Sequence, residues 1–405
     1  MTICGVIAEY NPLHLGHAYH LSEAKRISGA DALVVVMSGP VVQRGECAVA
    51  DPLARARWAV GAGADLVLEL PAAYACHNAQ LFARGAVGLL SSIGADAFCF
   101  GCESDNMDKL RQAAQLLYHE PEGFSALLKA HLKQGESFPR ARQLAMEAYL
   151  GDEAAPLLTQ ANNVLALEYL QACLHFQSQI KPLPVLRKGD GYRDTQTRSS
   201  FPSATSIRAA LAAGKAPVGL PLPVADELTQ RPPVLPSQLG PLVRWLLLSA
   251  DPDHLAQLPD MGEGLHLRLM KAAEENMDYE SIVKASLTRR YSEPRIKRAL
   301  LHGLLGMDQA DTDMLRRETP LFIRPLAMGQ KGPQLLSLLA SRTQLPLLTH
   351  PGRYRPENEQ ADRLWTINRH AWQLFALLDG QPSGWEMSPR LTPLKPWPQS
   401  DDKEE

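Results

Sequence analysis

The fold is decided near the N-terminus, by Gly5-Val-Ile-Ala-Glu-Tyr-Asn-Pro-Leu-His-Leu-Gly-His-Ala-Tyr-His20. An apolar run from Ile3 to Ala8 predicts a buried strand that breaks at Asn11-Pro12, and a helical pattern begins near Gly16. Free backbone N–H groups and the helix dipole attract an anion at such a break. His14 and His17 lie at this break, where imidazoles can stabilise the charge that develops on the bridging oxygens of a nucleotide triphosphate when it is attacked. Gly16 lets a phosphate approach the backbone closely. We therefore predict a nucleotide site at this turn.

The first half of the chain alternates strands and helices. Further buried strands are predicted at 32–39, 64–71 and 95–101, each separated from the next by a single helix. This order predicts an α/β fold with a doubly wound parallel sheet, similar to a Rossmann fold, in which ligands bind beyond the C-terminal strand ends. Those ends carry glycine and polar residues, namely Glu9 to His17, Ser38 to Gly45, Glu69, and Gly101 to Ser104.

Composition narrows the class of protein. The chain has 405 residues, a net charge of −3 and 45% hydrophobic residues, which suits a globular protein of two or more domains and gives no bulk basic charge for a nucleic acid. No apolar run reaches the roughly 18 residues of a membrane span, and no signal peptide is predicted. Six scattered cysteines fit a reducing cytoplasm. Cys99 and Cys102 have no second ligand pair nearby, so we predict a strand end there and no metal site.

The expected domain plan has four parts. Residues 1–215 form the nucleotide-binding domain, with a helical insertion at about 105–150. A proline-rich linker at 216–236 leads to an all-helical domain at 237–380. Residues 381–405, rich in proline and ending in acidic residues, are predicted to be a disordered tail.

Two later segments are candidates for ligand contact. Ser203-Ala-Thr205-Ser-Ile-Arg208 opens a helix and could direct two hydroxyl groups and a guanidinium at one phosphate, although Ser203 could equally be an ordinary helix cap. A basic cluster near a helix start could contact RNA or form a solvated face. Its members are Arg289, Arg290, Arg295, Lys297 and Arg298.

These motifs resemble known signatures. Asn11-Pro-Leu-His14-Leu-Gly-His17 resembles the HxGH signature of the nucleotidyltransferase superfamily, and Ser203 to Arg208 is similar to its second phosphate motif. From about residue 1 to 375 the chain resembles the bacterial tRNA(Met) cytidine acetate ligase family. That resemblance also rests on Val42-Gln-Arg-Gly-Glu46, Asp65-Leu-Val-Leu-Glu-Leu-Pro71, Asn162-Asn163, Arg187 and Arg295-Ile-Lys-Arg298.

The resemblance implies a reaction and a set of site residues. Acetate would be activated by ATP as acetyl-adenylate, and the acetyl group would pass to N4 of the wobble cytidine of elongator tRNA(Met). Mg²⁺ would accompany the ATP, because it normally bridges the phosphates in such reactions. His14, His17 and Arg208 would be catalytic, and Arg208 with Thr205 and Ser203 would hold phosphates. The expected nucleotide contacts are Ile7, Ala8, Glu9, Tyr10, Asn11, Pro12, Leu13, His14, Leu15, Gly16, His17, Ala18, Tyr19, His20, Gly101, Asn162, Arg187 and Lys188.

Two other functions remain open from the sequence. An adenylyltransferase of a small phosphorylated metabolite would share the first half of the argument but would leave the helical second domain and its basic cluster without a role. The other possibility is a tRNA-binding module that has kept the fold and lost catalysis. Salt-dependent RNA binding disfavours the former, and acetate-dependent pyrophosphate release disfavours the latter.

Overall fold

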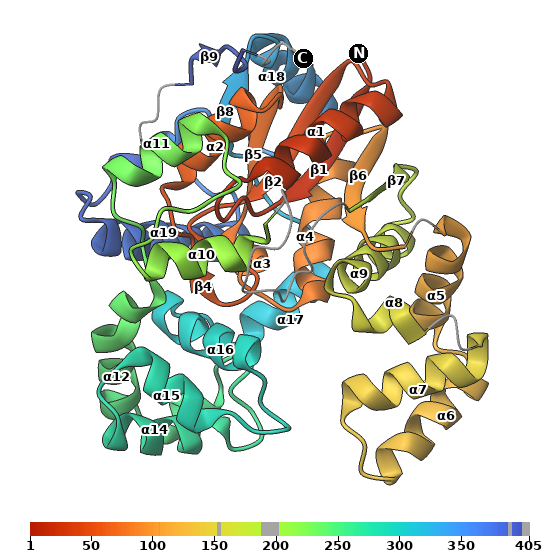
Figure 1. Cartoon of the computed structure of the whole chain (residues 1–405), viewed down its shortest axis with the longest axis vertical. Coiled ribbons are helices and arrows are strands. Elements are labelled where there is room, and N and C mark those ends of the chain that lie inside the picture. The colour runs from red at the N-terminus through yellow and green to blue at the C-terminus, as the bar shows by residue number, and fades with distance from the viewer. Residues whose placement is uncertain (105, 152–154, 188–201, 388–390, 399–405) are drawn as a thin grey trace.

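The structure is a computed structural model that describes all residues except 105, 152–154, 188–201, 388–390 and 399–405. Its centre is a sheet with the strand order β7-β6-β1-β2-β5-β8-β9 (Figure 1). β7, β6, β1, β2 and β5 are parallel, as the alternating sequence pattern predicts. The strands are β1 (Ile3–Ala8), β2 (Ala32–Ser38), β5 (Leu66–Leu70), β6 (Ala97–Cys102), β7 (Lys181–Leu186), β8 (Pro325–Gly329) and β9 (Pro393–Leu394), and β3 (Val41–Val42) pairs with β4 (Glu46–Cys47) in a separate hairpin.

β1 is the middle one of the five parallel strands, and its side chains alternate between two cores. Ile3 and Ile7 pack in the core that contains the inner side of α4, whereas Cys4 and Val6 pack in the core that contains α1 and α2. The chain passes from β1 to β2 on one side and later returns to β6 on the other. The strand order therefore reverses between β1 and β6, which is where an open α/β sheet binds its ligand.

Helices cover both faces of this sheet. Two of the predicted helix starts are observed directly, since Asp51 accepts a hydrogen bond from Leu53 N at 2.7 Å and Asn78 accepts one from Leu81 N at 3.0 Å. The helices of this part are α1 (Leu15–Ser28), α2 (Pro52–Gly61), α3 (Ala72–Ala75), α4 (Ala79–Ser92), α5 (Met107–His119), α6 (Glu122–Lys133), α7 (Phe138–Leu150), α8 (Ala155–Thr159), α9 (Ala161–His175) and α10 (Ala204–Ala212). The segment 105–150 is thus the helical arm α5–α7, which extends beside the sheet in Figure 1.

The proline-rich segment 216–236 is more ordered than a linker. It contains α11 (Leu222–Gln230), which begins with Pro223 in its first turn, so the prolines start a helix here instead of preventing one. Glu227 of α11 accepts hydrogen bonds from Trp58 Nε1 at 2.6 Å and Arg57 Nη2 at 3.0 Å, both on α2. α11 is therefore docked on the first domain.

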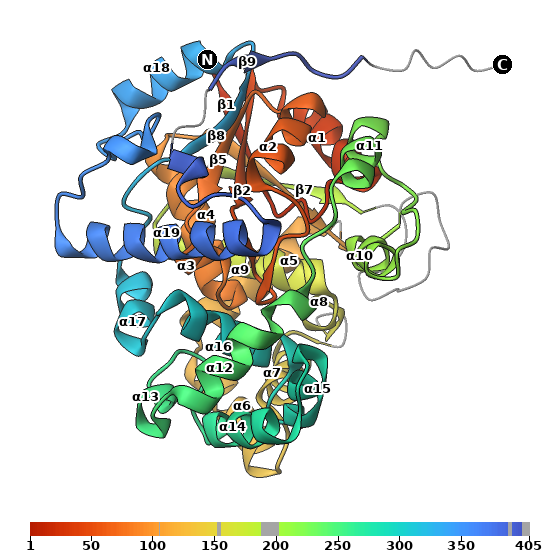
Figure 2. The ribbon, with the colours of Figure 1, turned by 90° about the vertical axis from the view of Figure 1, so that its left-hand side faces the viewer.

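The region after residue 237 is mainly helical, as predicted, but it also returns to the sheet. α12 (Gly240–Ser249), α13 (Pro252–Ala256), α14 (Leu265–Glu275), α15 (Tyr279–Ser286) and α16 (Glu293–Leu305) form a body below the sheet in Figures 1 and 2. The chain then continues through α17 (Gln309–Arg317), β8, α18 (Gly332–Arg342) and α19 (Glu359–Asp379), which crosses the sheet as the long helix of Figure 2. The prediction of helices alone is wrong for β8, which pairs antiparallel with β5.

A buried polar cluster attaches this returning segment to the sheet. Glu69, at the end of β5, accepts hydrogen bonds from Trp372 Nε1 at 2.6 Å, Asn368 Nδ2 at 3.1 Å and Arg324 Nη1 at 3.2 Å. Trp372 is fully buried, and the Arg324 guanidinium lies 4.3 Å from its ring centroid. The hydrogen bonds of Glu69 therefore hold α19 against the sheet. This differs from the expectation that the polar residue at this strand end faces a ligand.

The last described residues also pack on the sheet. β9 pairs with β8, and Trp397 N donates a hydrogen bond to Gly61 O at 2.8 Å. The prediction of a disordered tail is wrong for residues 391–398, because paired backbone and a packed tryptophan hold this segment. The described helices include none with the length and apolar character that crossing a membrane requires.

Candidate active site

A cavity of about 360 Å³ opens beyond the C-terminal ends of β1, β6 and β7. It lies at the reversal of strand order, with α1, α9 and α10 contributing further walls. Of the predicted residues, it is lined by Ile7, Ala8, Glu9, Tyr10, Asn11, His14, Gly16, His17, Tyr19, His20, Gly101, Asn162, Arg187 and Arg208. The remaining described ones, Pro12, Leu13, Leu15, Ala18, Ser203 and Thr205, are not among its lining residues, and Lys188 lies outside the described residues.

The two signature histidines are stacked at the start of α1. Their ring centroids are 3.7 Å apart with an interplanar angle of 24°, and His17 Nδ1 accepts a hydrogen bond from His14 N at 3.2 Å. With Nδ1 as acceptor, neutral His17 carries its proton on Nε2 and can donate it. Gly16 is required by this stacking, because a Cβ there would lie 2.9 Å from His14 Cε1. The glycine thus makes room for His14 as well as for a phosphate.

The histidines of this site are neutral at pH 7. Burial, followed by the charges of Arg187 and Arg208, lowers the pKa of His14 to about 3. Burial, followed by Arg187, lowers the pKa of His20 to about 4. The pKa of His17 is also held well below its usual value, first by burial and then by His14. These side chains therefore act as neutral hydrogen-bond donors, and an anion in the cavity would raise their pKa values.

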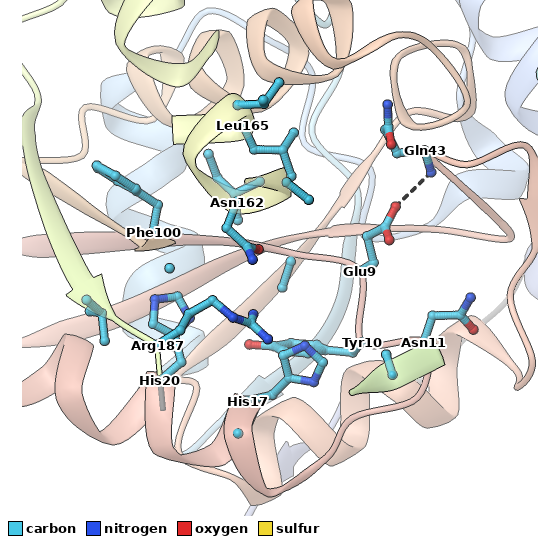
Figure 3. Close-up of a pocket in the computed structure, with 18 of the residues that line it drawn as sticks. Glu9, Tyr10, Asn11, His17, His20, Gln43, Phe100, Asn162, Leu165 and Arg187 are labelled. Atoms are coloured by element: carbon cyan, nitrogen blue, oxygen red, sulfur yellow. Dashed lines mark hydrogen bonds between the residues drawn. The ribbon is translucent and has the colours of Figure 1, made fainter. Parts of the chain in front are cut away.

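Positive charge comes from three arginines on separate elements, namely Arg44 in the hairpin β3–β4, Arg187 and Arg208. Arg187 follows β7 and extends across the cavity toward His17 in Figure 3. Arg208 of α10 donates to Asn11 O at 3.0 Å and to Thr205 Oγ1 at 3.4 Å, and its Nε lies 3.9 Å from Glu46 Oε2. Ser203 caps α10 by accepting a hydrogen bond from Ser206 N at 3.1 Å. In this structure Thr205 supports Arg208, and Ser203 serves as the helix cap.

Asn162 is held in place by Glu103, which the sequence does not identify. Glu103 Oε1 accepts a hydrogen bond from Asn162 Nδ2 at 2.6 Å, and its Oε2 accepts one from Asn163 N at 2.8 Å. Asn163 Oδ1 in turn accepts hydrogen bonds from Glu103 N and Ser104 N. The pattern Gln160-Ala-Asn162-Asn163 predicts a helix from Val164 that the asparagines cap, and this prediction is wrong, since α9 begins at Ala161 and the capping carboxylate comes from the end of β6. The only sequence signal for this contact is that Glu103 belongs to the polar segment that follows the predicted strand.

A second residue that the sequence does not identify is Arg55 on α2. Its guanidinium is fully buried and donates to the carbonyl oxygens of Glu9, Gly39 and Ala50. Burial lowers its pKa to about 10, so it remains charged at pH 7. Arg55 thus joins the ends of β1 and β2 and fixes the backbone at Glu9. A helix-start pattern predicts α2 but carries no information about the direction of this side chain.

The predicted basic cluster is largely neutralised by acidic partners. Lys297 Nζ lies 2.6 Å from Glu46 Oε1, and Arg298 Nε lies 2.9 Å from Asp260 Oδ2. Arg295, Lys297 and Arg298 are all engaged in such pairs, Arg295 with Glu263 at 3.1 Å and Lys297 also with Glu293 at 2.7 Å. Arg289 and Arg290 are exposed on the loop before α16.

Comparisons with known proteins agree with this geometry. A family model described as HIGH Nucleotidyl Transferase matches residues 1–385. The tRNA(Met) cytidine acetate ligase of Acetivibrio thermocellus is 38% identical over 86% of this chain and 88% of its own length. The protein of that name from Caldanaerobacter subterraneus subsp. tengcongensis is 36% identical over 93% of this chain and 95% of its own.

Solved structures are similar across nearly the whole chain. The apo crystal structure of Thermotoga maritima TmcAL superposes with a TM-score of 0.90 at 28% identity and covers 98% of this chain and 100% of that protein. A second crystal structure of it, bound with alpha-thio ATP, superposes with a TM-score of 0.87 at the same identity and coverage.

Proposed function

The chain belongs to the tRNA(Met) cytidine acetate ligase family of HIGH nucleotidyltransferases, and we propose that it is an ATP-dependent ligase of this specificity. It activates acetate as acetyl-adenylate and transfers the acetyl group to N4 of the wobble cytidine of elongator tRNA(Met). The observation that carries this proposal is the neutral His14–His17 stack, which shares a cavity with Arg187 and Arg208 where the strand order reverses.

The first half-reaction follows from the donors in the cavity. The triphosphate of ATP lies over the N-terminus of α1, where free N–H groups and the helix dipole favour anions. An acetate oxygen attacks the α-phosphorus, the new P–O bond forms, and the bond to the bridging oxygen breaks as pyrophosphate leaves. His17 Nε2–H donates to the developing charge, and Arg187 and Arg208 hold the phosphates. This work is positioning and electrostatic stabilisation, with no covalent step on the protein.

Magnesium is proposed to enter with its nucleotide. In the described part of the chain, no group of three or more His, Cys, Asp or Glu side chains could hold a metal ion. Mg²⁺ is bound largely by the phosphates of ATP in many related reactions.

The tRNA is proposed to contact the helical body formed by α12–α16, which corresponds to much of the expected second domain. Arg289 and Arg290 supply the exposed positive charge on this body, next to α16. We propose that the enzyme acts in the cytoplasm, where its tRNA and ATP are present.

One experiment tests the whole proposal. The protein is incubated with labelled acetate, ATP and total tRNA, and the tRNA is then digested to nucleosides. Labelled acetylcytidine that requires both ATP and acetate is the expected product. Pyrophosphate release without acetylcytidine in any tRNA would contradict the proposed acceptor.

A further inference from the structure

The cavity has two ends that differ in chemistry. Phe100, Asn162 and Arg187, from β6, α9 and the end of β7, lie at one end in Figure 3. Glu9 lies at the other end, beside Gln43, and the His17 ring lies between the two groups. Flat apolar and cationic side chains suit a nucleotide at the first end. The second end presents the Glu9 carboxylate, which does not itself bind a phosphate, although the charges of Arg208 and Arg44 act on it from the same cavity.

The Glu9 end is also the end that faces the helical body. Gln43 and Gly45 belong to the hairpin β3–β4, and Glu46 of this hairpin pairs with Lys297 of α16 at 2.6 Å. The contact is close, because Gly45 has φ of +80° and a Cβ there would lie 2.3 Å from Arg298 N. If RNA contacts the helical body, as proposed above, an extruded base would enter the cavity over this hairpin. Glu9 would be the first side chain of the cavity that it contacts.

The Glu9 side chain is arranged to receive a proton from such a base. Gln43 N donates to Oε1 at 2.7 Å, which fixes the carboxylate, while Arg55 fixes the backbone of the same residue. No hydrogen bond from another described residue occupies Oε2, and Glu9 lines the cavity. Burial raises the pKa of Glu9, against the opposing effects of the Gln43 N–H and of Arg208, Arg44 and Arg55. A carboxylate with a raised pKa is a stronger base than an exposed one.

We propose that Glu9 is the general base of acetyl transfer, accepting on Oε2 the proton that the cytidine amine loses. This inference rests on the proposed function. The N4 nitrogen attacks the acetyl carbonyl carbon and a C–N bond forms. The C–O bond to the phosphate breaks, and AMP leaves with that electron pair. The N4 proton passes to the Glu9 carboxylate and then to water, so the step balances without another reactant.

The test separates the two half-reactions in Glu9→Gln, which keeps an oxygen to accept the Gln43 N–H. Acetyl-adenylate formation is measured by acetate-dependent ATP–pyrophosphate exchange. Transfer is measured in a single turnover, by mixing enzyme-bound labelled acetyl-adenylate with tRNA. We expect transfer to slow by about 10² or more, the usual contribution of a general base, and exchange to fall far less. The wild-type transfer rate should rise with pH through the pKa of Glu9, and this limb should be absent in the variant.

A matched variant and a conservative one complete the design. Glu103→Gln alters the carboxylate that positions Asn162 and should impair exchange more than transfer. Glu9→Asp keeps a carboxylate and should restore part of the pH-dependent limb. Equal losses in both half-reactions, or a Glu9→Gln transfer rate within about threefold of wild type, would overturn the inference. A wild-type enzyme that forms no acetylcytidine would instead overturn the proposed function.

Discussion

Replacement of Glu103 by alanine tests whether the end of β6 controls the nucleotide site through α9. The carboxylate accepts hydrogen bonds from Asn162 Nδ2 at 2.6 Å, Asn162 N at 3.3 Å and Asn163 N at 2.8 Å. Its loss removes a helix cap, which costs about 0.5–2 kcal/mol of the free energy of unfolding. It also releases the Asn162 side chain. If that side chain gives ATP one hydrogen bond worth about 0.5–1.5 kcal/mol, KM for ATP rises about 2- to 12-fold.

A double-mutant cycle measures the coupling between these two residues. KM for ATP is determined by acetate-dependent ATP–pyrophosphate exchange in Glu103→Ala, Asn162→Ala and the double variant. We expect a coupling of about 1 kcal/mol, because Glu103→Ala should cost little once the Asn162 amide is absent. Asp108→Ala is the control, since that carboxylate is 88% exposed and makes only a loose ion pair, at 3.9 Å, with Arg111. Additivity within about 0.4 kcal/mol would refute the argument that Glu103 acts through Asn162.

Further predictions concern the histidines and the exposed arginines. His17→Ala should keep the fold and slow adenylate formation by about 10²–10³, the cost of one well-aimed donor, and undiminished pyrophosphate exchange would contradict that role. The pKa values of His14, about 3, and His20, about 4, lie below the unfolded value. The contribution of these histidines to the free energy of unfolding should therefore be fully present above pH ~6.5 and should be lost as the pH falls toward 4. The unfolding temperature should decline over this range, and added ATP should reduce the decline. Arg289→Ala and Arg290→Ala should each lower the salt slope of tRNA binding by about 1, and unchanged slopes would place the RNA elsewhere.

The sequence predicts the elements of the sheet well, because their signals are local. The apolar β-branched run at 32–38 can be buried on both faces only in a covered sheet, and Asp51-Pro52 is a start signal that acts within one turn. The turn between β1 and α1 is predicted for the same reason, since its strand, break and helix are contiguous. The arrangement of the His14–His17 stack agrees with the position at which both histidines were expected.

The sequence does not predict the contacts that depend on distant pairing. Glu69 stands at a strand end like Glu9 and Glu103, yet it binds Arg324 and Trp372, which lie 255 and 303 residues away. Nothing near Glu69 distinguishes it from a ligand-binding carboxylate. The ion pairs of the basic cluster could not be predicted either, because the acids that pair with Lys297 and Arg298 are Glu46 and Asp260. Charge patterns along one segment cannot reveal which charges a second segment will neutralise.

These pairs connect the cavity to the helical body. Glu46 lies between Lys297 of α16, at 2.6 Å, and Arg208 of α10, at 3.9 Å. The same hairpin fixes Glu9 through Gln43 N, while Arg208 reaches back to Asn11 O at the end of β1. A displacement of α16 would therefore move the hairpin, and with it the carboxylate at the acceptor end of the cavity. In the proposed reaction, a base presented by the helical body and a phosphate held at α1 would be located by one connected set of contacts, as acyl transfer from a bound adenylate to a tRNA requires.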